Sequence, residues 1–218
     1  MSMESRTIRR LVSAFVVAGL VLGAAVLVVG IAPGVKACIT PSGCDFLTGG
    51  GWIVYKGNKA TFGVGGGCKF GSPTWGHLEY HDHGYSGTVT NGQGLNVHGT
   101  SITGYMEGGT VGSPKDPKRT GTRFICGTAR TNLPFPNDNV NFVVIAKDAG
   151  EPGVNDTFDI YLKNRVTHAT VYDTLFECSY HYLGSYAPCS PGDGGGGNIQ
   201  LHKPNDSTTG EMGGYCDF

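Results

Sequence analysis

Short runs rich in β-branched and aromatic residues, separated by glycine, make up most of this chain and restrict what it can fold into. Glycine supplies 37 of the 218 residues, more than twice its usual share, without a Gly-X-Y period. In DTFDIYL, Phe158, Ile160 and Leu162 share one face of an extended segment, as they do in a half-buried strand. The runs of this kind are 51–55, 60–65, 76–83, 95–105, 123–129, 140–147, 156–162, 169–176 and 198–203. The sequence therefore predicts an all-β domain, with a β-sandwich favoured over a barrel.

The first 37 residues have the pattern of an export segment. Arginines 6, 9 and 10 precede an uncharged apolar run from Leu11 to Ala32, which is the order found in secretory signals. Small residues at 35 and 37 offer a cleavage site, yet the run of 22 residues is also long enough to span a bilayer. We expect residues 1–37 to be either a cleaved signal peptide or a retained N-terminal membrane anchor. In both cases the remainder is secreted, extracellular or held at the cell surface.

Seven cysteines follow this segment, and all of them lie in the part expected outside the cell. In an oxidising compartment the default role of cysteine is a disulfide, and no CxxC pair points to a zinc ribbon or a thioredoxin-like motif. Seven is an odd number, so one thiol is free or pairs with another molecule, and the sequence leaves the pairing open. The disulfide candidates are Cys38, Cys44, Cys68, Cys126, Cys178, Cys189 and Cys216.

The charge of the exported part argues against one class of partner. Residues 1–37 carry four basic residues and one acidic residue, so their removal takes the net charge from −1 to −4. A nucleic-acid-binding surface needs a basic footprint for the phosphates. Nucleic acid is therefore excluded as the expected partner.

The stretch GHLEYHDHG, from Gly76 to Gly84, is the densest group of chemically active side chains. On a strand, His77, Glu79, His81 and His83 would line one face. Same-face residues lie about 6.6 Å apart, whereas zinc holds nitrogen at about 2.1 Å, so only adjacent pairs could share one ion.

His98 in LNVHGT is the natural partner from a neighbouring strand, and we take His81, His83 and His98 as a candidate zinc or copper site. The interpretation favoured over this site is a polar sheet face with histidine–carboxylate hydrogen bonds, and the third is acid–base catalysis with Glu79.

An acidic loop, KDAGEPGVNDTFD, is a candidate calcium site. Asp148, Glu151 and Asp156 surround a turn, and hard oxygen ligands on an irregular loop suit calcium. The alternative is an acidic turn whose Asp and Asn side chains bond to their own backbone.

Two tryptophans offer aromatic surfaces. Trp75, in the loop GSPTWG, is the candidate platform for stacking on a sugar ring. Trp52, between Gly51 and Ile53, is expected in the core.

Five phrases occur in an order that resembles a known family. TGGGWIVYKGNKATFGVGGG is followed by GHLEYHDH, LNVHGT, VVIAKDAGEPGVNDTFDIYL and GGGGNIQLHK. Together, from Thr48 to Lys203, they resemble the "post-COAP" β domain of secreted bacterial surface proteins. The resemblance implies an Ig-like β-sandwich, often appended to other modules, and supplies no catalytic role. The chain departs from the family pattern in its cysteines, in the loop GSPKDPKRT and in a longer segment at 164–196.

These observations give one domain organisation and a ranked set of functions. We expect an export segment at 1–37, a cysteine-containing lead at 38–47, an Ig-like, disulfide-braced sandwich at 48–203 with an insertion around 164–196, and a flexible C-terminal tail at 204–218. The function expected first is that of an exported, non-catalytic structural or adhesive module that binds surface or matrix proteins, glycans or copies of itself. The alternatives are a carbohydrate-binding module and a metal-assisted hydrolase that uses Glu79, His81, His83 and His98.

Overall fold

The chain folds into β-structure, as the glycine-punctuated runs predict. The computed structural model describes residues 44–109, 120–135, 140–192 and 195–218, and within them lie ten strands and two short 3₁₀ helices. The strands are β1 (Phe46–Tyr55), β2 (Asn58–Gly67), β3 (Trp75–Asp82), β4 (Leu95–Glu107), β5 (Gly121–Thr131), β6 (Val140–Asp148), β7 (Thr157–Asn164), β8 (Thr170–Asp173), β9 (Gly197–His202) and β10 (Gly213–Gly214). The helices are η1 (Lys69–Gly71) and η2 (Thr174–Phe176). The all-β prediction is confirmed.

All strands belong to one antiparallel sheet in the order β8-β7-β6-β5-β4-β3-β2-β1-β9, and β10 pairs with β4. Successive strands from β1 to β8 are therefore neighbours in space as well as in sequence. The turn between β1 and β2 illustrates how adjacent strands are joined. Lys56 and Gly57 both have positive φ, 49° and 76°, as the turn of a two-residue β-hairpin requires.

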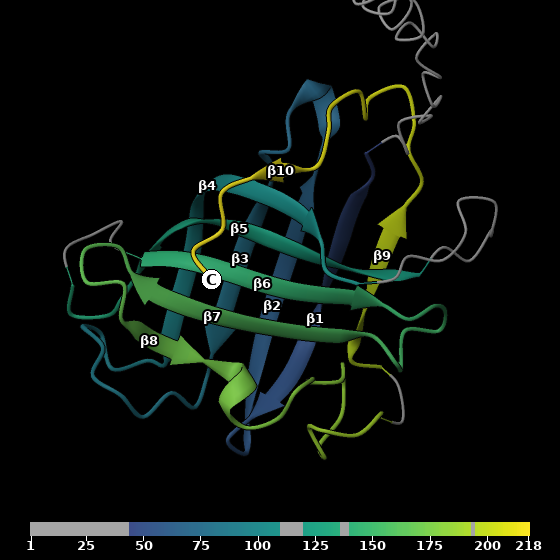
Figure 1. Ribbon diagram of the computed structural model, residues 1–218. Coiled ribbons are helices and arrows are strands. Elements are labelled where there is room, and N and C mark those ends of the chain that lie inside the picture. Colours follow the sequence, from purple (N-terminus) through teal and green to yellow (C-terminus); the bar gives the residue numbers. More distant parts are fainter. Residues whose placement is uncertain (1–43, 110–119, 136–139, 193–194) are drawn as a thin grey trace, which may run out of the picture. The chain divides into compact units, whose positions relative to one another are not determined.

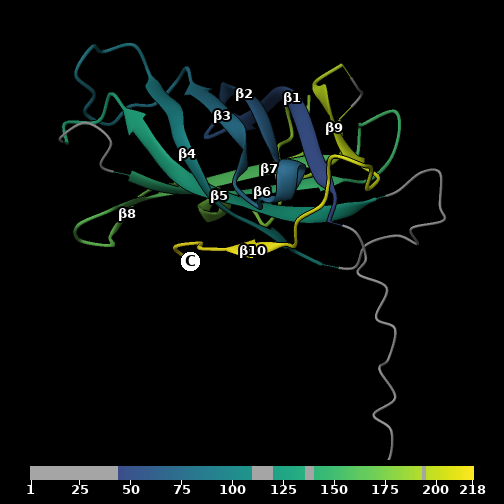
Figure 2. The same ribbon diagram turned by 90° about the horizontal axis from the view of Figure 1, so that it is seen from above.

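The sheet folds over on itself to make two layers. Figures 1 and 2 show the blue strands β1 to β3 crossing the green strands β6 and β7 on a separate level. Phe62 of β2 and Phe158 of β7 stack across the gap with ring centroids 3.8 Å apart. Gly66 of β2 packs so closely that a Cβ there would lie 2.8 Å from the side chain of Ile125 on β5. The core therefore lies between the two halves of one sheet.

This strand order differs from that of an immunoglobulin domain. Such a domain has two separate sheets joined by Greek-key connections. Here β1 to β8 follow one another in a meander, and among the described strands β9 and β10 join out of turn, beside β1 and β4 respectively. The Ig-like arrangement is therefore not confirmed, although two layers are present.

Three disulfides brace the sheet, as expected. Cys44–Cys68 joins the start of β1 to the end of β2, Cys126–Cys216 joins β5 to the C-terminal segment, and Cys178–Cys189 closes a loop after η2. Such bridges are typical of extracellular proteins. The seventh candidate, Cys38, and the expected export segment 1–37 lie outside the described residues. In the part of the chain that is described, no helix has the length and apolarity needed to cross a membrane.

Both ends of the expected domain contact the sheet. β1 begins at Phe46, inside the range expected for the lead, and Cys44 and Leu47 are buried in the core. The segment 204–218, expected to be a flexible tail, is attached to the sheet by β10 and by the disulfide of Cys216. Hydrogen bonds hold it as well: the hydroxyl of Thr103 donates to the carbonyl oxygen of Tyr215, and the amide of Asn141 donates to Asp217. These partners are distant in sequence, so the composition of the segment does not reveal its attachment.

Candidate functional site

The outer face of β3 carries the histidine-rich stretch in the predicted alternation. Leu78, Tyr80 and Asp82 point inward and are buried, whereas His77 and Glu79 are exposed. Tyr80 and Asp82 are joined through the hydroxyl of Tyr172, which fixes the inward row. The predicted alternation is confirmed, and it places His77 and Glu79 on the surface of the sheet.

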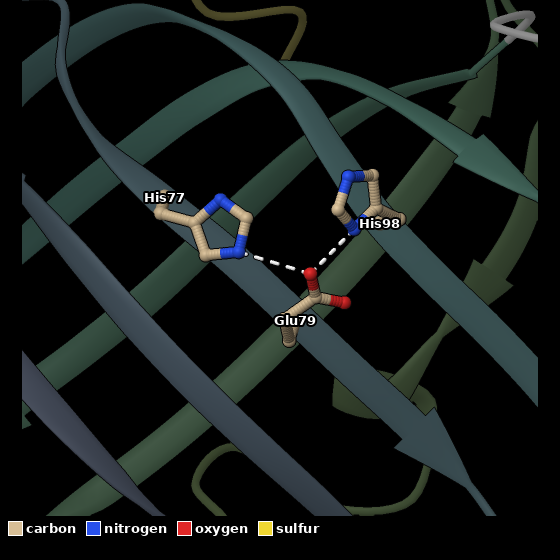
Figure 3. Close-up of side chains that lie close together, drawn as sticks. All are labelled: His77, Glu79 and His98. Atoms are coloured by element: carbon tan, nitrogen blue, oxygen red, sulfur yellow. Dashed lines mark hydrogen bonds and ion pairs between the residues drawn. The ribbon is translucent and has the colours of Figure 1, made fainter.

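Three of the exposed side chains converge: His77 and Glu79 of β3 and His98 of β4 (Figure 3). The antiparallel register sets His98 directly opposite Glu79. One carboxylate oxygen of Glu79, Oε1, accepts hydrogen bonds from Nε2 of His77 at 2.9 Å and from Nδ1 of His98. The side chains are 46–55% exposed, so the group is open to solvent.

This trio has the donor atoms of a transition-metal site. Two imidazole nitrogens and one carboxylate oxygen suit zinc or copper. The ligand atoms of the three residues all lie within 4.8 Å of one another. Zinc ligands bound at about 2.1 Å lie roughly 3.4 Å apart in a tetrahedron, so small rotations of exposed side chains would complete the geometry. A fourth position would remain open.

The metal set predicted from the sequence was partly different. His98 joins His77 and Glu79, not His81 and His83, because register opposes His81 to Asn96. His81 Nε2 lies 3.0 Å from the carbonyl oxygen of Gln93, and His83 Nε2 lies 3.2 Å from the hydroxyl of Thr61. Within the described ranges, His77, Glu79 and His98 are the only group of three or more such residues close enough to hold one ion.

Glycines of β2 leave this face open beside the trio. Gly63 pairs with Glu79, and Gly65 pairs with His77. A Cβ at position 63 would meet no atom within 4 Å. The result is a hollow of about 220 Å³, whose lining includes Gly63, Glu79, His81, Asn96 and His98. The signal in the sequence was the alternation TFGVG, which puts glycines on the same face as the histidines.

The aspartates of the acidic loop between β6 and β7 accept hydrogen bonds from backbone N–H groups, and the carboxylates of the loop do not form a converging group. Asp148 accepts from the N–H of Gly150 and Leu201, at 2.7 and 2.8 Å. Asp156 accepts from Ala149 and Ile199, both at 2.8 Å, and so clamps the loop to β9.

Glu151 accepts from the side-chain amide of Asn198 at 3.1 Å. The calcium site at Asp148, Glu151 and Asp156 stays a prediction, and the turn alternative describes the contacts seen.

Burial gives Asp156 an unusual titration, which leads to a testable pH dependence. Burial raises the pKa of Asp156 from 3.8 to about 6, although the two N–H donors oppose the shift. Between pH 3.8 and about 6, Asp156 keeps a proton in the folded state that it has lost in the unfolded chain. The contribution of Asp156 to stability therefore decreases as pH rises, by about 1.4 kcal/mol per pH unit. Asp156→Asn removes this titration.

We expect the difference in unfolding free energy, wild type minus Asp156→Asn, to fall by about 2–3 kcal/mol from pH 4 to pH 7. Urea denaturation at each pH measures it. A difference that stays constant or increases over this range would show that Asp156 is ionised in the fold at pH 4.

Both tryptophans are partly buried. Trp75 is half-buried: the ring of Phe46 packs edge-on at 5.9 Å, and the ammonium of Lys69 lies over its face at 4.4 Å. Trp52 was expected in the core but is only partly buried, because the alternation of β1 turns Ile53 inward instead. Trp52 contacts the exposed ring of Tyr186 at 5.1 Å.

A larger cavity of about 770 Å³ lies at the β1–β2 turn and the β8 end of the sheet, with Tyr55, Tyr85, Tyr172 and Phe176 in its lining. Its size is in the range of small-ligand sites. Carbohydrate binding remains a prediction, for which these aromatic rings offer a second surface besides Trp75.

Comparisons with protein-family models, with curated proteins and with solved structures found no match to this chain. The resemblance of Thr48–Lys203 to the post-COAP domain therefore stays a prediction. The assignment of function depends on the chemistry of the site.

Proposed function

We propose that this chain is an exported, disulfide-braced β module that binds a divalent transition-metal ion, zinc or copper, on the outer face of β3 and β4. The observation that supports this best is the convergence of His77, Glu79 and His98, whose ligand atoms lie within 4.8 Å of one another beside an open hollow. Two imidazole nitrogens and a carboxylate oxygen are ligands that zinc takes in proteins.

The proposed role is structural or adhesive, not catalytic. The trio stands on a half-exposed sheet face, where a fourth ligand can come from water or from a donor group of a neighbouring surface molecule. In the alternative, a metal-assisted hydrolase, the metal would activate a bound water and Glu79 would act as the acid–base group. Glu79, the base in that alternative, lies between the two imidazoles as the third ligand. The resemblance to post-COAP surface domains, with their Ig-like fold, agrees with a role in adhesion and is part of the proposal.

Calorimetric titration of the exported protein, purified without chelator, with Zn²⁺ and with Cu²⁺ tests the proposal. We expect one ion per chain, and a loss of affinity of at least about tenfold in both Glu79→Gln and His98→Ala, because even groups that only orient ligands have effects of this size. His83→Ala is the matched control: it removes an exposed imidazole at the end of the same strand, outside the trio. Absence of stoichiometric binding, or an equal loss in His83→Ala, would contradict the proposal.

A further inference from the structure

One disulfide, Cys178–Cys189, lies beside a buried histidine that the proposed function does not use. The Nε2 atom of His181 is 3.6 Å from Sγ of Cys178. The two cysteines are 11 residues apart in the loop that follows η2, in the yellow-green part of Figure 1. The contact therefore joins a sulfur bridge to a group that can carry positive charge.

The imidazole of His181 is held in one orientation. It is fully buried, and Nδ1 donates to Oδ1 of Asp159 at 2.7 Å, which points Nε2 at the sulfur. Asp159 is fixed in turn by the hydroxyl of Thr174 and by the backbone N–H of His181. Asp159 therefore orients His181 in the way that a carboxylate orients the histidine base beside a nucleophile.

The charged groups that face His181 favour its protonated form. They are Asp159 and Glu177, whose Oε2 lies 3.4 Å from Nε2, and the ring of Tyr55 packs edge-on at 5.9 Å. Burial alone would lower the pKa of His181, but the hydrogen bond and the charge of Asp159, together with Glu177, raise it above the ordinary value. A cation beside a cysteine sulfur stabilises the thiolate.

Access distinguishes this bridge from the other two. Cys189 is exposed and Cys178 is partly exposed. Cys44, Cys68 and Cys126 are at most 2% exposed, so each of the other bridges has at least one sulfur in the core. An attacking thiol can therefore approach Cys189 directly.

We propose that Cys178–Cys189 is a redox-active site that exchanges with small thiols, with Cys178 as the leaving sulfur. A thiolate attacks Sγ of Cys189 and forms a mixed disulfide, while the Cys178–Cys189 bond breaks and its electron pair stays on Cys178 as a thiolate beside His181. A second small thiol, as its thiolate, then attacks the sulfur of the first small thiol in the mixed disulfide. The Cys189 thiolate is released and takes up a proton, and the two small thiols leave together as a disulfide. Two thiols are oxidised and one protein disulfide is reduced.

The experiment treats the exported protein with reduced glutathione, traps free thiols with an alkylating agent, and quantifies each cysteine by peptide mass spectrometry. We expect Cys178–Cys189 to be reduced at least about tenfold faster than Cys44–Cys68 and Cys126–Cys216. Reduction of all three at similar rates would overturn the proposal.

Exposure alone could make this bridge react first, so a second arm measures the role of His181. After selective reduction, the rate of alkylation of Cys178 is followed against pH, with Cys189 of the same chain as the internal reference. We expect at least about tenfold more thiolate at Cys178 than at Cys189 near pH 6.5.

His181→Asn keeps a side-chain donor for Asp159 but removes the imidazole, and should abolish the difference. Equal alkylation of the two cysteines in the wild type would overturn the proposal, even if the variant fails to fold.

Discussion

Replacing Asp45 by asparagine is expected to lower the free energy of unfolding by about 3–5 kcal/mol. Asp45 and Arg123 are both fully buried. The carboxylate accepts from Nε of Arg123 at 3.0 Å, from its Nη2, and from the hydroxyl of Tyr105 at 2.6 Å. The asparagine has nearly the same shape but no charge. The variant would therefore leave the guanidinium buried beside a neutral amide, which is the costly way to break such a pair.

Urea denaturation of the protein with its disulfides intact measures this effect. Asp206→Asn is the control, because it makes the same chemical change at an exposed turn residue and should alter stability by less than about 0.5 kcal/mol. If Asp45→Asn also changes the unfolding free energy by less than about 1 kcal/mol, the buried ion pair does not stabilise this fold.

Removal of Cys126–Cys216 is expected to cost more stability than removal of Cys178–Cys189, because Cys126–Cys216 closes a longer loop. Its cysteines are 90 residues apart, against 11 for Cys178–Cys189. Constraint of the unfolded chain by these loops corresponds to about 4.6 and about 2.8 kcal/mol, respectively. The longer bridge also holds the C-terminal segment against β4 and β5.

The paired variants Cys126→Ala with Cys216→Ala, and Cys178→Ala with Cys189→Ala, make the comparison. Equilibrium unfolding should show the first pair to be less stable than the second by about 2 kcal/mol. Equal losses, or a larger loss in the second pair, would mean that the C-terminal segment adds little to the fold and that loop entropy does not control the effect.

Local pattern was enough to predict nine of the ten described strands and the two faces of β3. The alternation in GHLEYHDH placed His77 and Glu79 outward and Leu78 inward, as the structure has them. The partner strand of the site was also predictable, because LNVHGT is the next apolar run along the chain and adjacent runs pair in a meander. What failed was the register: the loop between β3 and β4 sets His98 opposite Glu79, and no local signal encodes that offset.

Contacts between distant residues were beyond prediction for the same reason. Asp45 and Arg123 are separated by 78 positions, and neither lies in a motif that suggests the other. His181 and Asp159 meet only because the segment after η2 returns to β7. Trp52 was assigned to the core from its apolar neighbours, and the strand phase turned it the other way.

A crystal structure of the exported protein grown with Zn²⁺, with diffraction data collected on both sides of the zinc absorption edge, tests the proposed metal site directly. We expect an anomalous peak about 2 Å from a ring nitrogen of His77, a ring nitrogen of His98 and a carboxylate oxygen of Glu79. A map with no peak at this position, or with zinc bound only elsewhere on the surface, would contradict it.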